Sequence, residues 1–341
     1  MKFWVACLIV ALVAFTCSSQ LSARLGDTRA ATDIAWRSEA LPASPMLAFT
    51  TVVLGGFHGI IADLLWLRAT DLQDQGRYVE LVQLAGWITS FEPRASQAWA
   101  FHAWNMAYNV SLVMPTPEEK WRWVRNGIRL LRDQGLAFNP RDPVLCFELS
   151  VLYQHKIGRS TDDAHMFYKA ALAHDMDVAL GGGGSGNALD ADGRALLKSR
   201  YSLDWDNMQA LHERFGELDW RLPESHALYW AQRGVDVSPN QKNRRCSHIV
   251  VSALASTVFA GTFSWADDGQ GYQRGPNVVF LPVAIKAYQD MITDYDLPDM
   301  NESLRSFLES VMPLLEAGGD AERLDQVREV LEALPVSPPP A

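Results

Sequence analysis

Two short stretches decide the fold: Ser90-Phe91-Glu92-Pro93-Arg94 and Ala137-Phe138-Asn139-Pro140-Arg141-Asp142. Each follows a segment with helical periodicity, and each places an acidic or amide residue before a proline and an arginine after it. Proline ends a helix because it lacks the backbone N–H and its ring clashes with the preceding turn. The recurrence of helix, turn, helix and proline stop therefore predicts repeated helix pairs, which bury their apolar faces by stacking on one another.

Helical periodicity extends to both sides of these turns. Apolar residues at helical spacing mark one face of the first helix of the pair that ends at the first turn: Ile60, Leu64, Leu67 and Leu72. The second helix, after Gly76, continues this face with Val79, Val82, Trp87 and Ile88. Residues 115–119, Pro-Thr-Pro-Glu-Glu, are typical of a helix N-terminus, because proline fits the first turn and carboxylates favour the positive end of the helix dipole. Further helices are expected over residues 97–114, 118–138, 143–157, 162–176, 205–215, 222–234, 245–259, 282–295, 300–315 and 321–334.

Composition divides the chain into six segments. The expected order is a targeting segment (1–23), a stalk (24–45), helical repeats (46–180), a glycine-rich loop and connection (181–200), further helical hairpins (201–334) and a disordered tail (335–341). The Gly-Gly-Gly-Gly-Ser-Gly run at 181–186 has no GK[ST] signature and no preceding strand, so we expect a flexible loop and no phosphate site. Strand character is confined to Val-Val-Phe-Leu at 278–281.

Overall charge limits the classes of partner. The 341 residues are 48% hydrophobic and 21% charged, as in a globular protein, and the formal net charge is -10. Phosphate contacts need clustered lysine and arginine, so this charge argues against a nucleic-acid partner. The nearest basic run, Lys242, Arg244 and Arg245, is short, and we expect it to be a solvated turn.

The N-terminus has the pattern of a targeting segment. Lys2 is followed by fifteen uncharged, mostly apolar residues, 3–17. At 1.5 Å per residue this run reaches about 22 Å, short of the roughly 30 Å hydrocarbon core, and continuation to Ala23 brings it to spanning length. We favour an uncleaved signal anchor. The alternatives are a lipoprotein signal acylated at Cys17 and simple cleavage with secretion.

These three fates share one topology. Lys2 stays on the cytoplasmic side, so the bulk of the chain is expected in the periplasm of a bacterium, tethered to the inner membrane where the segment is retained. A second apolar run, 46–62, favours a buried first helix of the folded part. The alternative is a second membrane span, which would return the folded part to the cytoplasm.

The four cysteines do not form a disulfide framework. Cys7 and Cys17 lie in the targeting segment, which leaves Cys146 and Cys246 for the folded part. Neither belongs to a CxxC motif or a Cys/His cluster. We favour buried thiols, and a single Cys146–Cys246 bridge remains the alternative in an oxidising compartment.

No catalytic residue, metal ligand or cofactor is expected. Asp162, Asp163 and His165 lie close in sequence, but Asp162 stands where a helix N-cap belongs and Asp163 favours the helix dipole. We prefer these roles to a metal site, because no HExxH motif is present. No GxSxG motif exists, and neither Cys146 nor Cys246 has a persuasive histidine partner.

Aromatic density indicates recognition. Six of the twelve tryptophans fall between Trp66 and Trp123, and helical spacing puts His102 with Asn105, and Asn105 with Asn109, on a common face. Aromatic rings beside amides and arginine make good binding surfaces. We expect a partner-binding groove formed by eight residues: Trp66, Arg68, Trp99, His102, Asn105, Asn109, Trp123 and Arg125. The alternative is that the aromatic rings fill gaps between repeats.

A family resemblance rests on five strings: GGFHGIIADLLWLRA at 55–69, AWNMAYN at 103–109, WRWVRNG at 121–127, QHKIG at 154–158 and DWRLPE at 219–224. Together they resemble a group of bacterial tetratricopeptide-repeat-like (TPR-like) envelope proteins of uncharacterised function, over most of residues 50–295. The resemblance implies a membrane-proximal helical repeat protein and brings no catalytic residues. Two features depart from the general TPR pattern: the helix pairs exceed 34 residues, and Gly135 stands where alanine is usual before Pro140.

The predicted fold is all-α, a right-handed TPR-like α-solenoid with an N-terminal membrane-targeting helix. The expected function is a membrane-anchored scaffold or adaptor that binds a protein partner in a bacterial envelope assembly. The alternative is a helical enzyme or binding domain that handles a glycan or peptide in a groove of Trp, Asn and His side chains. No acid, base, nucleophile or metal set is recognisable, which favours the scaffold. Residues 261–281 are a candidate to fold over the groove.

Overall fold

The computed structural model describes residues 58–186, 189–266 and 271–335. The targeting segment 1–23 with its lipidation candidate Cys17, the stalk 24–45, and most of the apolar run 46–62 and of the tail 335–341 lie outside the described residues. Within the described ranges, no helix combines the length and the apolar character needed to cross a membrane.

The described chain is mostly helical, which confirms the all-α prediction. The first half consists of α3 (His58–Asp74), α4 (Tyr78–Phe91), α5 (Ser96–Trp104), α6 (Pro117–Arg129), α7 (Leu136–Phe138), α8 (Pro143–Val151) and α9 (His165–Leu180). The second half consists of α10 (Ala191–Leu196), α11 (Trp205–Phe215), α12 (Pro223–Asp236), α13 (Arg244–Ala260), α14 (Leu281–Tyr295), α15 (Met300–Gly318) and α16 (Ala321–Ala333). Short 3-10 turns lie at η2 (Ser111–Val113), η6 (Pro239–Gln241) and η7 (Val278–Phe280).

Helices α5, α6, α8 and α10 continue without a break into π-helical segments. These segments are η1 (Asn105–Val110), η3 (Leu130–Gly135), η4 (Leu152–Ile157) and η5 (Leu197–Tyr201). In a π segment the backbone N–H bonds the carbonyl five residues back, as the Gly158 N–H does to Tyr153 O at 2.9 Å. Such segments are rare and occur frequently at functional sites.

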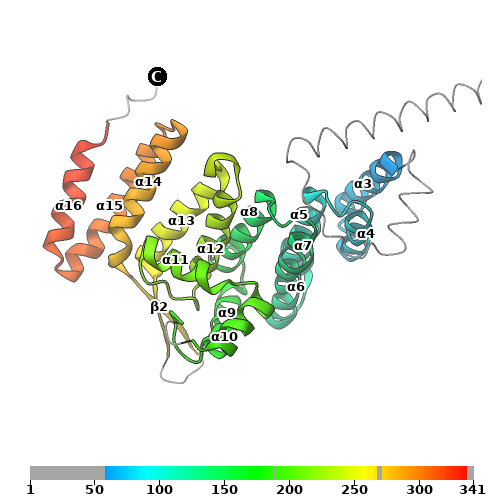
Figure 1. Cartoon of the computed structure of the whole chain (residues 1–341), viewed down its shortest axis with the longest axis horizontal. Helices are drawn as coiled ribbons and strands as arrows, with labels where there is room; N and C mark the ends of the chain where they lie inside the picture. Colours follow the sequence, from blue (N-terminus) through cyan, green and yellow to red (C-terminus); the bar gives the residue numbers. More distant parts are fainter. Residues whose placement is uncertain (1–57, 187–188, 267–270, 336–341) are drawn as a thin grey trace, which may run out of the picture.

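The helices follow one another along the long axis of the molecule, from α3 and α4 at one end to α15 and α16 at the other (Figure 1). Chain neighbours pack against each other in the pairs α3–α4, α12–α13, α13–α14, α14–α15 and α15–α16. Helix α12 also packs on α8, and its Trp230 is fully buried. One continuous core extends from Trp99 to Val327, and a smaller cluster around Leu81 and Ile88 joins α3 to α4.

The two proline turns contact each other. Pro93 O accepts hydrogen bonds from Trp99 Nε1 at 2.8 Å and from Asn139 Nδ2 at 2.9 Å. Asp142 caps the N-terminus of α8 and also accepts a hydrogen bond from the Ser96 hydroxyl at the start of α5. The residues that punctuate the sequence therefore also fasten successive helix pairs together.

A β-hairpin interrupts the helices after α13. Its strands, β1 (Thr262–Trp265) and β2 (Tyr272–Gly275), pair antiparallel. They form the one sheet in the described ranges and lie within the segment 261–281.

The strand predicted at 278–281 is wrong. Residues 278–280 form the 3-10 turn η7, and Leu281 begins α14. Pro282 gives the physical reason, because it fits the first turn of a helix and lacks the N–H that a strand would donate.

The glycine-rich segment ends one helix and leads to another. Gly181, with φ +67°, is the left-handed residue that closes α9. Gly184 O accepts a hydrogen bond from the Trp220 N–H at 2.8 Å, which ties this loop to the approach to α12. The range 181–200, expected as loop and connection, thus contains α10 and most of η5.

Candidate functional site

Three of the eight residues predicted to form a groove lie in the interior. Trp99, His102 and Asn105 are at most 5% exposed. Asn105 Nδ2 donates to Phe101 O at 2.9 Å, and Asn105 Oδ1 accepts from Asn109 Nδ2 at 2.5 Å. Burial lowers the pKa of His102 to about 4, and neither of its ring nitrogens has a partner among the described residues.

The other predicted residues are spread over α3 and α6. Trp66 packs edge-on against Phe101, with ring centroids 5.0 Å apart. Arg68 forms an ion pair with a carboxylate one turn along the exposed side of α3. Trp123 and Arg125 are half-buried on α6. None of the eight lines the two cavities described next, so their role in partner binding stays a prediction.

A groove of about 1180 Å³ opens between α8–η4, α13 and the start of α15. At one end Trp104, which is 42% exposed, stacks on Tyr108 of η1 with ring centroids 5.3 Å apart. Phe147 of α8 and Met291 of α14 continue the apolar lining. The groove thus offers aromatic surface that remains in contact with water, as binding sites do.

A buried ion pair forms the floor of the groove. Lys156 Nζ contacts Asp162 Oδ2, and both side chains are 2% exposed. The Tyr168 hydroxyl donates to the same oxygen at 3.2 Å, and the Ala164 N–H donates to Oδ1 at 2.9 Å. Burial raises the pKa of Asp162, but the hydrogen bonds from Lys156 and Ala164 outweigh it and lower the pKa to about 2. Because Lys156 and Asp162 neutralise each other within the chain, we assign this pair a structural role.

The helix start predicted at Asp162 is wrong. Helix α9 begins at His165, with Ala164 at the N-cap position, and the Asp162 carboxylate serves Lys156. Asp163 pairs with Lys120 at 2.6 Å. Among the described residues, no group of three His, Cys, Asp or Glu side chains is arranged to hold a metal ion.

A second ion pair lies on the wall of the groove. Arg245 is 62% exposed, approaches Glu148 to 3.6 Å and places its guanidinium carbon 3.9 Å from the centre of the Phe147 ring. Burial raises the pKa of Glu148, and Arg245 opposes this shift. Exposed ion pairs contribute at most about 1 kcal/mol, so Arg245 exchanges its partner for a ligand at small cost.

Four basic residues line the groove and the smaller cavity next to it, and we call them the basic cluster: His155, Arg159, Arg244 and His248. Burial lowers the pKa of His155, and Arg159 and His248 lower it further. Burial, Arg159 and Arg244 lower the pKa of His248 in the same way. No carboxylate contributes to either shift, and none of the four forms an ion pair within the described part of the chain. The lowered pKa values leave the two histidines mostly neutral near pH 7, so the positive charge of the cluster comes from Arg159 and Arg244. Two arginines without a paired carboxylate favour a bound anion.

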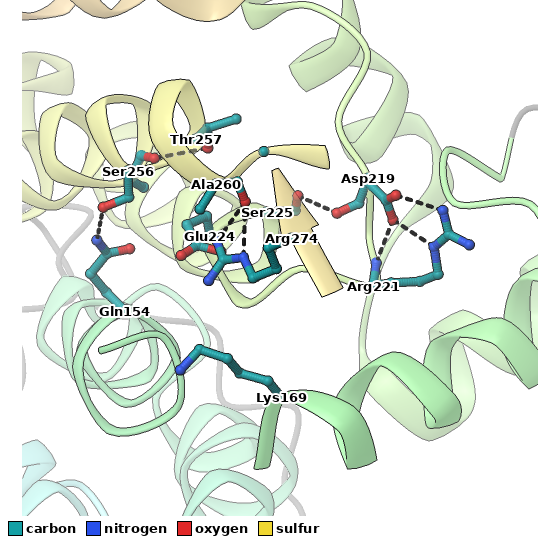
Figure 2. A network of polar contacts seen from close by, with 12 residues as sticks. Gln154, Lys169, Asp219, Arg221, Glu224, Ser225, Ser256, Thr257, Ala260 and Arg274 are labelled. Atoms are coloured by element: carbon teal, nitrogen blue, oxygen red, sulfur yellow. Dashed lines mark hydrogen bonds and ion pairs between the residues drawn. The ribbon is translucent and has the colours of Figure 1, made fainter. Parts of the chain in front are cut away.

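A smaller cavity of about 310 Å³ continues the groove along α13. The two cavities share His248 and Met300, so the basic cluster lies where they meet. Phe259 lines the far end, and Ser256 lies on the floor, where its hydroxyl accepts a hydrogen bond from Gln154 Nε2 at 3.1 Å (Figure 2). Together the cavities follow most of α13, whose 17 residues span about 25 Å.

A second polar region lies under the β-hairpin, and there Arg274 has its partners within the chain. Arg274 Nη2 of β2 lies 2.7 Å from a Glu224 oxygen at the start of α12, and the side chains are 14% and 5% exposed. The N–H groups of Arg274 are aimed at Ala260 O, at 2.7 and 2.9 Å, where α13 ends (Figure 2). Nearby Lys169 donates to Arg159 O at 3.3 Å, and burial, with Arg274 adding to it and Glu224 opposing, lowers its pKa to about 8. This network fastens the hairpin to α12 and α13.

Both folded-part cysteines are free, buried thiols, the arrangement that the sequence favours. Burial raises the pKa of Cys146 and of Cys246 to about 12, so neither is a nucleophile near neutral pH. They approach each other beside Gly234, where an added Cβ would lie 2.5 Å from Cys246 Sγ and 3.2 Å from Cys146 Cβ. The absence of a side chain at Gly234 makes room for both.

The groove residues missed from sequence have recognisable signals. Trp104 and Tyr108 belong to the predicted aromatic helix but line the cavity, unlike its buried residues. Arg244 and Arg245 are solvated as predicted, but the turn predicted for them is wrong, because Arg244 begins α13 one residue before the expected helix start. Asn243 caps that helix with its side-chain oxygen, and asparagine before an apolar-periodic segment is a preferred N-cap.

No protein-family model, no curated protein and no solved structure matches the chain. Its function therefore has to be inferred from the groove and the groups that line it.

Proposed function

We propose that this chain is a membrane-anchored, TPR-like scaffold that binds a segment of a protein partner in the groove along α13. The observation that carries the proposal is the groove itself, about 1180 Å³ of open space bordered by Trp104, Tyr108 and Phe147. Aromatic side chains are enriched at protein interfaces, because they bury a large area and lose little conformational entropy when they are ordered.

The order of packing supports a TPR-like solenoid. Consecutive helices pack on each other at both ends of the molecule, α3 to α5 and α12 to α16 (Figure 1). In between, the first proline turn accepts a hydrogen bond from the second. Stacked helix pairs create the extended surfaces on which repeat proteins bind their partners. The strings at 55–69 and 121–127 that resemble TPR-like envelope proteins point in the same direction.

The length of the groove sets the size of the occupant. At about 25 Å, the length of α13, it accommodates seven or eight residues of extended chain or about four turns of helix. A segment of this size uses the helix-in-groove or extended mode of peptide recognition. The proposed occupant is therefore a short segment of a partner and not a folded domain.

The proposed location follows from the N-terminus. Segment 1–23 would hold the scaffold at the bacterial inner membrane, with Lys2 on the cytoplasmic side and the groove in the periplasm. The partner is then a protein of an envelope assembly.

Site-specific photocrosslinking in membranes of the source bacterium tests this function. A benzophenone amino acid replaces Leu112, which lines the groove and is 56% exposed, and in a matched control it replaces Val178, which is 65% exposed and lies outside the groove. We expect one envelope protein to crosslink at Leu112 and not at Val178. The same protein, once purified, should bind the full chain and fail to bind a Trp104→Glu variant.

Two results contradict the scaffold. Equal crosslinking from Leu112 and Val178 would mean that the groove has no special role. A glycan or small peptide that co-purifies with the chain, with no protein crosslinked at Leu112, would support the ligand-handling alternative instead.

A further inference from the structure

We infer that the segment held in the groove carries an acidic side chain flanked on both sides by apolar ones, and that the basic cluster binds this acid. The inference rests on the scaffold function proposed above and specifies the chemistry of the partner segment. It depends on the side chains that line the two cavities on either side of the shared residue His248, and on the arginines there that no carboxylate pairs.

The order along the groove is apolar, basic, apolar. The larger cavity presents the stacked Trp104 and Tyr108, the basic cluster lies at the shared residue His248, and the smaller cavity continues to Phe259. A helical segment presents side chains at i, i+3 or i+4 and i+7 to such a groove. A central carboxylate with a bulky apolar residue one turn before it and another one turn after it matches this order.

The charge of the cluster stands out against the rest of the molecule. The formal net charge of the chain is -10, and the buried cations Lys156 and Arg274 are each paired with a carboxylate, Asp162 and Glu224. In the larger cavity the acidic residues are Asp162, Glu148, which pairs with Arg245, and Asp299 at the start of α15. None of these carboxylates forms an ion pair with the basic cluster, so the charges of Arg159 and Arg244 are open to an anion from outside.

A carboxylate in that position would make charge-assisted hydrogen bonds. Arg244 is exposed at the rim, so its guanidinium can reach a ligand without moving the helix, and His248 lies one turn further along α13. Arginine fits a carboxylate in a bidentate geometry, which adds directional preference to the charge attraction.

Peptide display against the full chain in lipid nanodiscs tests the inference. A phage library of random 12-residue peptides is first depleted on the Trp104→Glu variant, so that binders to other surfaces are removed, and is then selected on the wild type. We expect enriched peptides with Asp or Glu between bulky apolar residues. Replacing that acid by its amide in synthetic peptides should weaken binding about tenfold, measured by fluorescence anisotropy.

A charge-reversed variant supplies the matched comparison. Arg244→Glu/His248→Glu should weaken binding of the acidic peptides at least tenfold and leave their amide versions within about threefold of wild type. Arg328→Glu, on the exposed surface of α16, is the control and should change neither. Both replaced groove residues are exposed, so the variant keeps its fold.

The outcomes separate the inference from the function on which it rests. Enriched peptides that need Trp104 but contain no conserved acid would overturn the inference and leave the scaffold intact. An absence of Trp104-dependent peptides, together with a crosslinked envelope partner at Leu112, would also overturn the inference alone. Failure of both peptide selection and crosslinking would overturn the scaffold function itself.

Discussion

The two polar regions of this molecule are built in opposite ways. Under the hairpin, Arg274 is buried and meets the Glu224 carboxylate and a backbone carbonyl. At the groove, Arg244 and His248 are exposed and face other basic groups. The first region uses its charges to hold elements together, and the second leaves its charges to a ligand. The position of unpaired charge, and not its amount, therefore marks the candidate site.

The largest expected effect on stability comes from breaking the buried Arg274–Glu224 ion pair under the hairpin. Glu224→Ala removes the counter-charge of Arg274 and leaves a buried cation without it, which should lower the free energy of unfolding by about 3 kcal/mol. Chemical denaturation of the full chain followed by circular dichroism measures the change. Asp325→Ala breaks the exposed Arg328–Asp325 pair and is the control, with an expected change below about 1 kcal/mol. Equal losses in the two variants would contradict the comparison.

The next effect on stability is expected from lowering the pH, because acid protonates the buried histidines. Burial lowers the pKa of His102 and of His226 to about 4, while the unfolded chain titrates near 6.5. Between these values the unfolded state binds protons that the folded state does not, so the free energy of unfolding should fall as the pH is lowered from about 6.5 to about 4. The expected loss is on the order of 3 kcal/mol for each histidine, because one pKa unit corresponds to about 1.4 kcal/mol.

Variants of single histidines show which residue causes this loss of stability in acid. Denaturation at a series of pH values should show a smaller slope for His226→Gln than for the wild type. His248→Gln at the groove should keep most of the slope, because this residue is exposed. An unchanged slope in His226→Gln would show that acid acts elsewhere.

A smaller effect is expected inside the predicted groove of Trp, Asn and His side chains. Asn105→Ala removes a buried side chain that donates to Phe101 O and accepts from Asn109, so unfolding should become easier by about 1 to 2 kcal/mol. Binding of the groove peptides should not change. Asn301→Ala removes an exposed hydrogen bond to Pro298 O and is the control, with a smaller expected loss. Loss of peptide binding in Asn105→Ala, with stability unchanged, would show that the partner binds at the groove predicted from sequence, which includes Asn105.

Local chemistry explains how much of the fold could be predicted. The proline turns and the Pro117 helix start appear in the structure, because backbone rules act over a few residues and are visible in sequence. The π segments and the hairpin were not predicted. A π segment shifts the hydrogen bonding by one residue within an otherwise helical pattern, which leaves no mark in the apolar spacing. The strands at 262–265 and 272–275 are short, and Arg274 fastens them to the end of α13 through Ala260 O.

The site was less predictable, since its parts come from distant segments. Composition located the aromatic helix correctly, but helical spacing alone does not tell which face meets the core and which meets water. Trp104 lines the groove and Trp99, five residues earlier, is buried. The basic cluster joins His155 and Arg159 to Arg244 and His248, and only packing of α13 on α8 brings them together.

The smallest change in stability is expected from substitutions in the basic cluster. These substitutions test directly whether the groove and the hairpin network use their charges differently. Arg244→Glu/His248→Glu removes mutual repulsion from exposed positions, so the free energy of unfolding should stay within about 0.5 kcal/mol of wild type or rise slightly. The same variant should raise the pKa of His155, because it replaces His248, which lowers that pKa, by a carboxylate. A titration of His155 followed by NMR measures that shift, and Arg328→Glu on α16 should leave it unchanged. A loss of more than about 1 kcal/mol would mean that the cluster supports the fold as the hairpin network does, and charge left open at the groove would then be no sign of a ligand.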